Sequence, residues 1–168
     1  MKTMKKLFLS LTIIMLVLSV GTNALAWSST TPPGSGNTGT LTTEGVTVGF
    51  GSSGISSSID TTKCYTGIST YKVKASGLYL DGNSEKLCTV KLGVNYWNST
   101  KSDWERGNRY TKTLPKTNVK DSNGNYQPSK QSISSQDVSA NGSKYYHYGI
   151  FTKDYTSIKM YGSFTLHK

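Results

Sequence analysis

Two segments of this chain alternate apolar and polar residues with a period of two, a pattern that restricts them to β-strands. In residues 88–96 the apolar positions are Val90, Leu92 and Val94, and residues 158–166 repeat the alternation. Because successive side chains of a strand point to opposite faces, each segment presents one apolar face to a core. A helix would scatter the same residues around its circumference, so we expect an all-β fold.

Shorter strand-like runs lie at 46–50, 71–75 and 145–151, with Asn-Gly and Asp-Gly sequences between several of the runs. Such dipeptides favour tight turns between antiparallel strands. The turn at 81–83 predicts a hairpin joining the strand before it to the strand that begins near Leu87. No segment has the spacing of an amphipathic helix. We therefore predict a small antiparallel β-sandwich or barrel.

The first 26 residues have the pattern of a secretory signal peptide. Basic residues begin the chain, an apolar stretch follows at 7–20, and Ala24-Leu25-Ala26 provides a small-x-small cleavage pattern. The apolar stretch is short for a membrane span, so we expect cleavage before Trp27 and no transmembrane segment in the mature chain. The protein is accordingly expected to be secreted, into the extracellular space or onto the cell surface.

Composition divides the remaining sequence into two parts. Residues 27–43 are rich in Ser, Thr, Gly and Pro and are predicted to form a flexible arm. Residues 44–168 contain all the strand-like runs and are predicted to form a single β domain. The overall pattern is typical of small secreted bacterial proteins.

Cys64 and Cys88 are the only cysteines. In an exported protein such a pair most simply forms one disulfide, which would contribute on the order of 3 kcal/mol by closing a loop of about 24 residues. Two free thiols are the alternative. With only two unclustered histidines besides the cysteines, we expect no metal site.

The charge of the chain is strongly positive. Cleavage after Ala26 would remove three of the 19 Lys and Arg residues and leave 16 against 9 Asp and Glu, a formal net charge of +7. Outside the cell the available polyanions are lipid head groups, wall polymers and acidic polysaccharides, whereas nucleic acid is not an expected partner. A simpler interpretation is that the charge only maintains solubility.

Aromatic residues with a polar edge are unusually frequent, with 11 Tyr and 3 Trp against 4 Phe. Such rings can stack on sugars or lie at a lipid interface, although many of them are also needed for core packing. Several lie close to basic residues. The predicted ligand contacts are Trp97, Trp104, Arg106, Arg109, Lys112, Tyr145, Tyr146 and Tyr148.

Candidate catalytic patterns are weak, and we expect neither enzymatic activity nor a cofactor. Residues 49–54 match a dinucleotide-binding fingerprint, but no helix follows them. His147 is accompanied by no nucleophile motif. Asp103 and Glu105 share one face of a predicted strand, as paired glycosidase carboxylates can, although nine acids produce such pairs by chance.

Three functions remain compatible with these features. The first is a secreted, non-enzymatic module that binds an anionic polymer, glycan or lipid surface of the cell envelope. The second is a secreted bacteriocin-like or membrane-active toxin, because cationic charge and interfacial aromatic residues suit either role. The third is a small secreted hydrolase.

Overall fold

The computed structural model describes residues 33–82 and 86–168, in which every regular element is a β-strand apart from one short 3-10 turn. The predicted signal peptide and residues 27–32 of the predicted arm lie outside the described residues. The elements are η1 (Ser35–Asn37), β1 (Val46–Gly49), β2 (Ser58–Asp60), β3 (Thr70–Leu80), β4 (Cys88–Asn98), β5 (Asp103–Leu114), β6 (Asn118–Lys120), β7 (Tyr126–Pro128), β8 (Gln131–Ser139), β9 (His147–Lys153) and β10 (Met160–His167).

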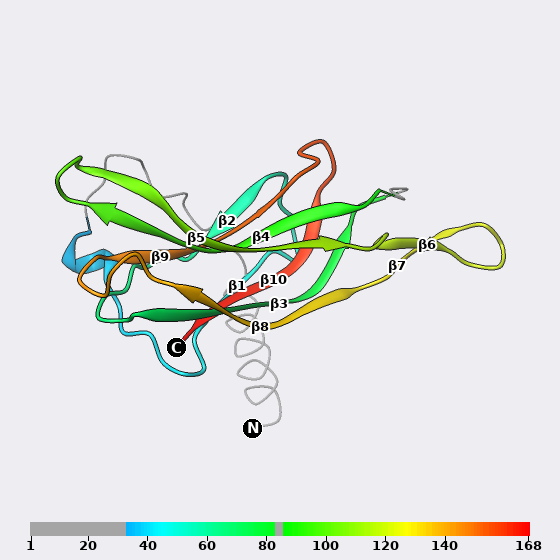
Figure 1. Cartoon of the computed structure of the whole chain (residues 1–168). Helices are drawn as coiled ribbons and strands as arrows, with labels where there is room; N and C mark the ends of the chain where they lie inside the picture. The colour runs from blue at the N-terminus through cyan, green and yellow to red at the C-terminus, as the bar shows by residue number, and fades with distance from the viewer. Residues whose placement is uncertain (1–32, 83–85) are drawn as a thin grey trace, which may run out of the picture.

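Two four-stranded sheets make up the body of the molecule (Figure 1). The first has the order β1-β10-β3-β8 and the second the order β2-β9-β4-β5, and all their strand pairs are antiparallel. The strands β6 and β7 form a separate hairpin that extends away from the body. The predicted all-β antiparallel architecture is confirmed, and it is an open sandwich rather than a closed barrel.

The core lies between the two sheets, where the alternating pattern placed it. Val90, Leu92 and Val94 of β4 are fully buried, and so are the inward residues Phe164 and Leu166 of β10. Burying a side chain of this size contributes roughly 1.5–3 kcal/mol. Sequence periodicity therefore identified the inner faces of both strands.

The segment after β3 does not form the predicted hairpin. β3 pairs with β10 and β8, whereas β4 pairs with β5 and β9, so residues 81–87 connect one sheet to the other. Gly82 does adopt the left-handed conformation that favours glycine in a turn, with φ of 58°. A turn signal is local, however, and it does not determine whether the strands that flank it pair in one sheet or face each other across a core.

The predicted disulfide is wrong, because Cys64 and Cys88 are both free and buried. Tyr65 forms a bridge with His147, which pairs with Tyr96 on β4. Cys88 precedes Tyr96 by eight residues along that strand, a distance of roughly 25 Å at the usual rise per residue. A disulfide requires Cα atoms within about 7 Å, so the two thiols at opposite ends of the second sheet cannot join.

The described part of the predicted arm, residues 33–43, packs on the sandwich. The backbone amide of Gly39 donates to the carbonyl of Cys64 (3.0 Å), and the amide of Cys64 donates to the carbonyl of Asn37 (2.8 Å). Leu41 is only 3% exposed and belongs to the core. A Ser- and Gly-rich segment thus gains order from backbone hydrogen bonds and from one buried leucine.

Candidate binding face on the second sheet

The outer face of the second sheet gathers most of the predicted ligand contacts. The even-numbered residues Val90, Leu92 and Val94 of β4 point into the core, so the odd-numbered residues point outward with their cross-strand neighbours. We call these residues the outer face: Thr89, Lys91, Asn95 and Trp97 on β4, Trp104, Arg106, Arg109, Thr111 and Thr113 on β5, and Tyr148, Ile150 and Thr152 on β9.

Three aromatic rings form a connected cluster at one end of this face. The Trp97 and Trp104 rings, directly opposite each other on β4 and β5, lie 5.4 Å apart between centroids at an angle of 66°. The Trp104 ring meets the Tyr148 ring edge to face at 4.8 Å and 74°. Each such contact contributes about 0.5–1.5 kcal/mol beyond the area it buries. The cluster therefore has a defined geometry.

Exposure differs within the aromatic cluster. Tyr148 is 5% exposed, whereas both tryptophans keep part of their surface in solvent. The Tyr148 hydroxyl accepts a hydrogen bond from the Asn95 amide nitrogen (2.6 Å), and burial raises the pKa of Tyr148. Tyr148 is thus a buried, hydrogen-bonded ring against which Trp104 packs, and Trp97 packs in turn against Trp104.

Arg109 is turned toward the backbone rather than toward solvent. Its guanidinium donates to the carbonyls of Val94, Gly107 and Asn108 and to the side-chain oxygen of Asn95. Burial lowers the pKa of Arg109 to about 10, so it still carries its charge near neutral pH. Its hydrogen-bonding capacity is used within the sheet, which makes it a positioning residue for Asn95.

A β-bulge places both arginines on the outer face. Asn95 lies opposite Arg106 and Gly93 lies opposite Arg109, so β5 carries one extra residue between these two pairs. In a regular strand, residues three apart would point to opposite faces. Arg106 remains exposed beside the aromatic cluster and is the available cation there.

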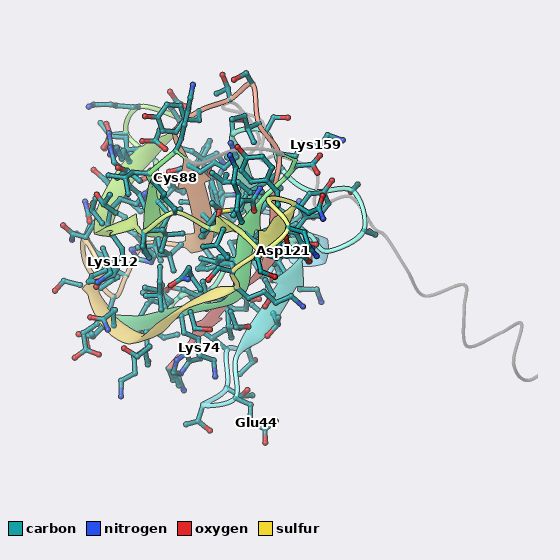
Figure 2. The ribbon with its side chains drawn as sticks, turned by 90° about the vertical axis from the view of Figure 1, so that its right-hand side faces the viewer. Glu44, Lys74, Cys88, Lys112, Asp121 and Lys159 are labelled. Carbon is teal, nitrogen blue, oxygen red and sulfur yellow. The ribbon has the colours of Figure 1, made fainter. Side chains whose placement is uncertain are left out.

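Other predicted contacts lie elsewhere. Lys112 is opposite the core residue Val90 and is exposed on the other side of the edge strand β5, as its position in Figure 2 shows. Tyr145 packs against Tyr96 with 5.4 Å between ring centroids, and the Lys144 ammonium lies 5.2 Å from the Tyr145 ring. Lys112 and Tyr145 are therefore not part of the aromatic cluster.

Tyr146 lies next to the cluster. The backbone amide of Trp97 donates to the Tyr146 carbonyl (2.9 Å), which extends the pairing of β4 with the segment before β9. Tyr146 is partly exposed. It can therefore border a ligand bound over Trp97.

The candidate catalytic groups are engaged in packing and hydrogen bonds. His147 is fully buried between Tyr71 and Tyr96, with centroid distances of 5.1 and 6.4 Å, and burial lowers the pKa of His147 to about 4. Glu105 accepts hydrogen bonds from Lys101, Tyr96 and Asn98, which lower the pKa of its carboxyl to about 2. That carboxyl is ionised near neutral pH and has no proton to donate.

The neighbouring carboxylate, Asp103, accepts a hydrogen bond from the Trp104 amide (2.7 Å).

In the described part of the chain, no group of three or more His, Cys, Asp or Glu side chains could hold a metal ion. Within the same residues, no helix has the length and apolarity needed to cross a membrane.

The other end of the outer face borders a cavity of about 380 Å³. It is lined by Thr89, Lys91, Thr152, Lys153 and Asp154. Sequence analysis did not single out Lys91, although the alternation in 88–96 already placed it on the same strand face as Trp97. The position of Thr152 beside it depends on the pairing of β4 with β9, which the sequence alone does not reveal.

Comparisons of this chain with protein-family models, with curated proteins and with solved structures found no match in any of the three.

Proposed function

We propose that the protein is a secreted, non-enzymatic module that binds a glycan surface of the cell envelope through the outer face of its second sheet. The observation that carries this proposal is the cluster of Trp97, Trp104 and Tyr148 beside the exposed Arg106. Half-exposed indoles that pack against each other and against a buried tyrosine offer apolar surface to a sugar ring, and the neighbouring cation favours an acidic sugar.

The cluster is also rigid, which favours binding. Trp104 is held between Trp97 and Tyr148, and Asn95 is hydrogen-bonded to both Tyr148 and Arg109. Side chains that are already fixed lose less conformational entropy when a ligand binds. An open sheet face also suits an extended polymer better than it suits a small molecule, which usually requires a concave site.

Pull-down of the secreted protein with purified cell wall tests the proposal. Trp104→Ala removes the central ring and is expected to reduce the bound fraction at least tenfold, whereas Trp104→Phe keeps a ring and retains part of the binding. Tyr126→Ala, which removes an aromatic ring from the distant β6–β7 hairpin, is the matched control and should bind as the unaltered protein does. Unchanged binding by a folded Trp104→Ala variant would refute the proposed contact.

A second candidate is a membrane-active toxin, favoured by the opposite end of the molecule. The large hydrophobic side chains exposed in the described residues are Leu87 (54%), Val119 (48%) and Tyr155 (41%). They lie on the β3–β4 connection, the protruding hairpin and the β9–β10 connection, which share one end of the sandwich (Figure 1). The Lys86 ammonium lies 5.2 Å from the Tyr155 ring, so cationic and apolar groups occur together there.

Dye release from vesicles of anionic phospholipid separates the two candidates. A toxin that acts on membranes would release dye, and the double substitution of Leu87→Ser and Val119→Ser would abolish the release. The wall-binding module that we favour leaves the vesicles intact, and the same double variant binds cell wall normally.

A further inference from the structure

We propose that the ligand is an extended anionic polysaccharide. It is bound by the aromatic cluster at one end of the outer face and by an anion subsite around Lys91 at the other end. This inference rests on the proposed function and names its substrate class. The side chains that carry it are Lys91, Thr111 and Thr152, none of which belongs to the aromatic cluster.

The two binding elements are joined by one strand. Lys91 and Trp97 both point outward from β4 and are separated by six residues. At the usual rise per residue, this separation is about 20 Å, with Asn95 and Arg106 between the two ends. A ligand that contacts both ends must be a polymer that lies along the strand, because a single sugar is too short.

The surroundings of Lys91 suit an anion. Thr111 lies directly opposite Lys91 on β5, and Thr152 lies directly opposite it on β9. In the adjacent row the hydroxyls of Thr89 and Thr113 are 3.3 Å apart. An ammonium group flanked by hydroxyl donors matches the oxygens of a phosphate or a carboxylate.

One carboxylate also lines this cavity, and its interactions are local. The Asp154 side chain accepts a hydrogen bond from the Thr89 amide (2.8 Å). Lys153 donates to the backbone carbonyls of Asp154 and Tyr155, at 3.0 and 2.7 Å. With Lys91 and Lys153 beside one Asp154, the cavity has a net positive charge.

The charged residues along the whole outer face also favour an anionic ligand. Its outward residues on β4, β5 and β9 include the cations Lys91, Arg106 and Arg109 and no Asp or Glu. Asp60, a carboxylate on the neighbouring edge strand β2, is only 6% exposed, so it presents little negative surface to a ligand. A polyanion that follows β4 therefore meets the cations Lys91 and Arg106, and no outward carboxylate of these three strands opposes them, which raises both affinity and association rate.

The experiment compares Lys91→Gln with Lys74→Gln. Lys74 is exposed on the outer face of the first sheet, so its substitution changes the net charge equally (Figure 2). The probes are polygalacturonic acid, phosphorylated dextran and neutral dextran of matched length, together with disaccharide fragments of each charged polymer. Comparing polygalacturonic acid, which carries carboxylates, with phosphorylated dextran identifies which anion the subsite prefers.

For the long charged polymers, Lys91→Gln is expected to weaken binding roughly fivefold and to reduce its salt dependence, whereas Lys74→Gln has little effect. For neutral dextran, Lys91→Gln should change nothing, because that polymer has no anionic group for the subsite. For the disaccharides the change should be small, because they are too short to reach from the aromatic cluster to Lys91. If Lys91→Gln and Lys74→Gln weaken binding equally while Trp104→Ala abolishes it, the anion subsite is refuted and the proposed function stands. If none of the three variants affects binding, both proposals fail.

Discussion

At the scale of single residues, the burial of His147 makes the stability of the fold depend on pH. It is fully buried, and burial lowers its pKa to about 4, whereas an unfolded chain binds that proton near pH 6.5. Below pH 6.5 the unfolded state therefore holds more protons than the native state, and stability is lost as the pH falls toward 4. The free energy of unfolding should drop by about 2 kcal/mol between pH 7 and pH 5.

Urea unfolding measured across this range checks the prediction. A His147→Leu variant should lose most of the pH dependence, and His167→Gln, which changes a partly exposed histidine, should keep it. Identical pH profiles for His147→Leu and the unaltered protein would show that another group is responsible. The range above pH 5 keeps most carboxyl titrations out of the comparison.

At the scale of elements, the β4–β5 pair depends on the absence of a side chain at Gly93. A Cβ atom there would lie 2.0 Å from the carbonyl oxygen of Asn108, which is backbone in the paired strand and cannot easily move. Gly93→Ala should therefore lower the free energy of unfolding by about 1–3 kcal/mol, as overpacking usually does. Thermal unfolding of this variant and of Gly51→Ala checks the prediction. Gly51→Ala introduces a Cβ with no atom within 4 Å and should leave the free energy of unfolding nearly unchanged.

The same strand pair shows which structural features a sequence pattern can predict and which it cannot. Period-two alternation predicted that Val90, Leu92 and Val94 point inward, because that relation depends only on neighbouring residues. The register that brings Trp97 opposite Trp104 was not predictable in this way. It depends on the turn between β4 and β5 and on the bulge that brings Arg106 and Arg109 to one face.

At the scale of the whole molecule, sequence reasoning failed where segments distant in the chain meet. The cysteine pairing relied on compartment and number, whereas the fold places Cys64 and Cys88 at opposite ends of the second sheet. Likewise, the sequence did not reveal that the predicted ligand contact Tyr148 is buried and packs against Trp104, because that arrangement results from the pairing of β9 with β4.

The two thiols give a direct prediction about the whole fold. Both cysteines are fully buried, and burial raises the pKa of Cys64 to about 11 and that of Cys88 to about 12. The native protein should therefore react very slowly with iodoacetamide at pH 8, and the denatured, unreduced protein should take up two equivalents. Mass spectrometry counts the labels, and a denatured protein that takes up none would contradict the arrangement of the strands.

The central claim is that a glycan binds along the outer face of the second sheet. It is tested most directly by NMR titration of the ¹⁵N-labelled secreted protein with soluble fragments of purified cell wall. We predict that the largest shifts occur at the indole N–H groups of Trp97 and Trp104 and at Arg106, while Lys72 and Lys74 on the first sheet stay unchanged. Shifts confined to the first sheet or to the β6–β7 hairpin, with both indoles unaffected, would contradict the account.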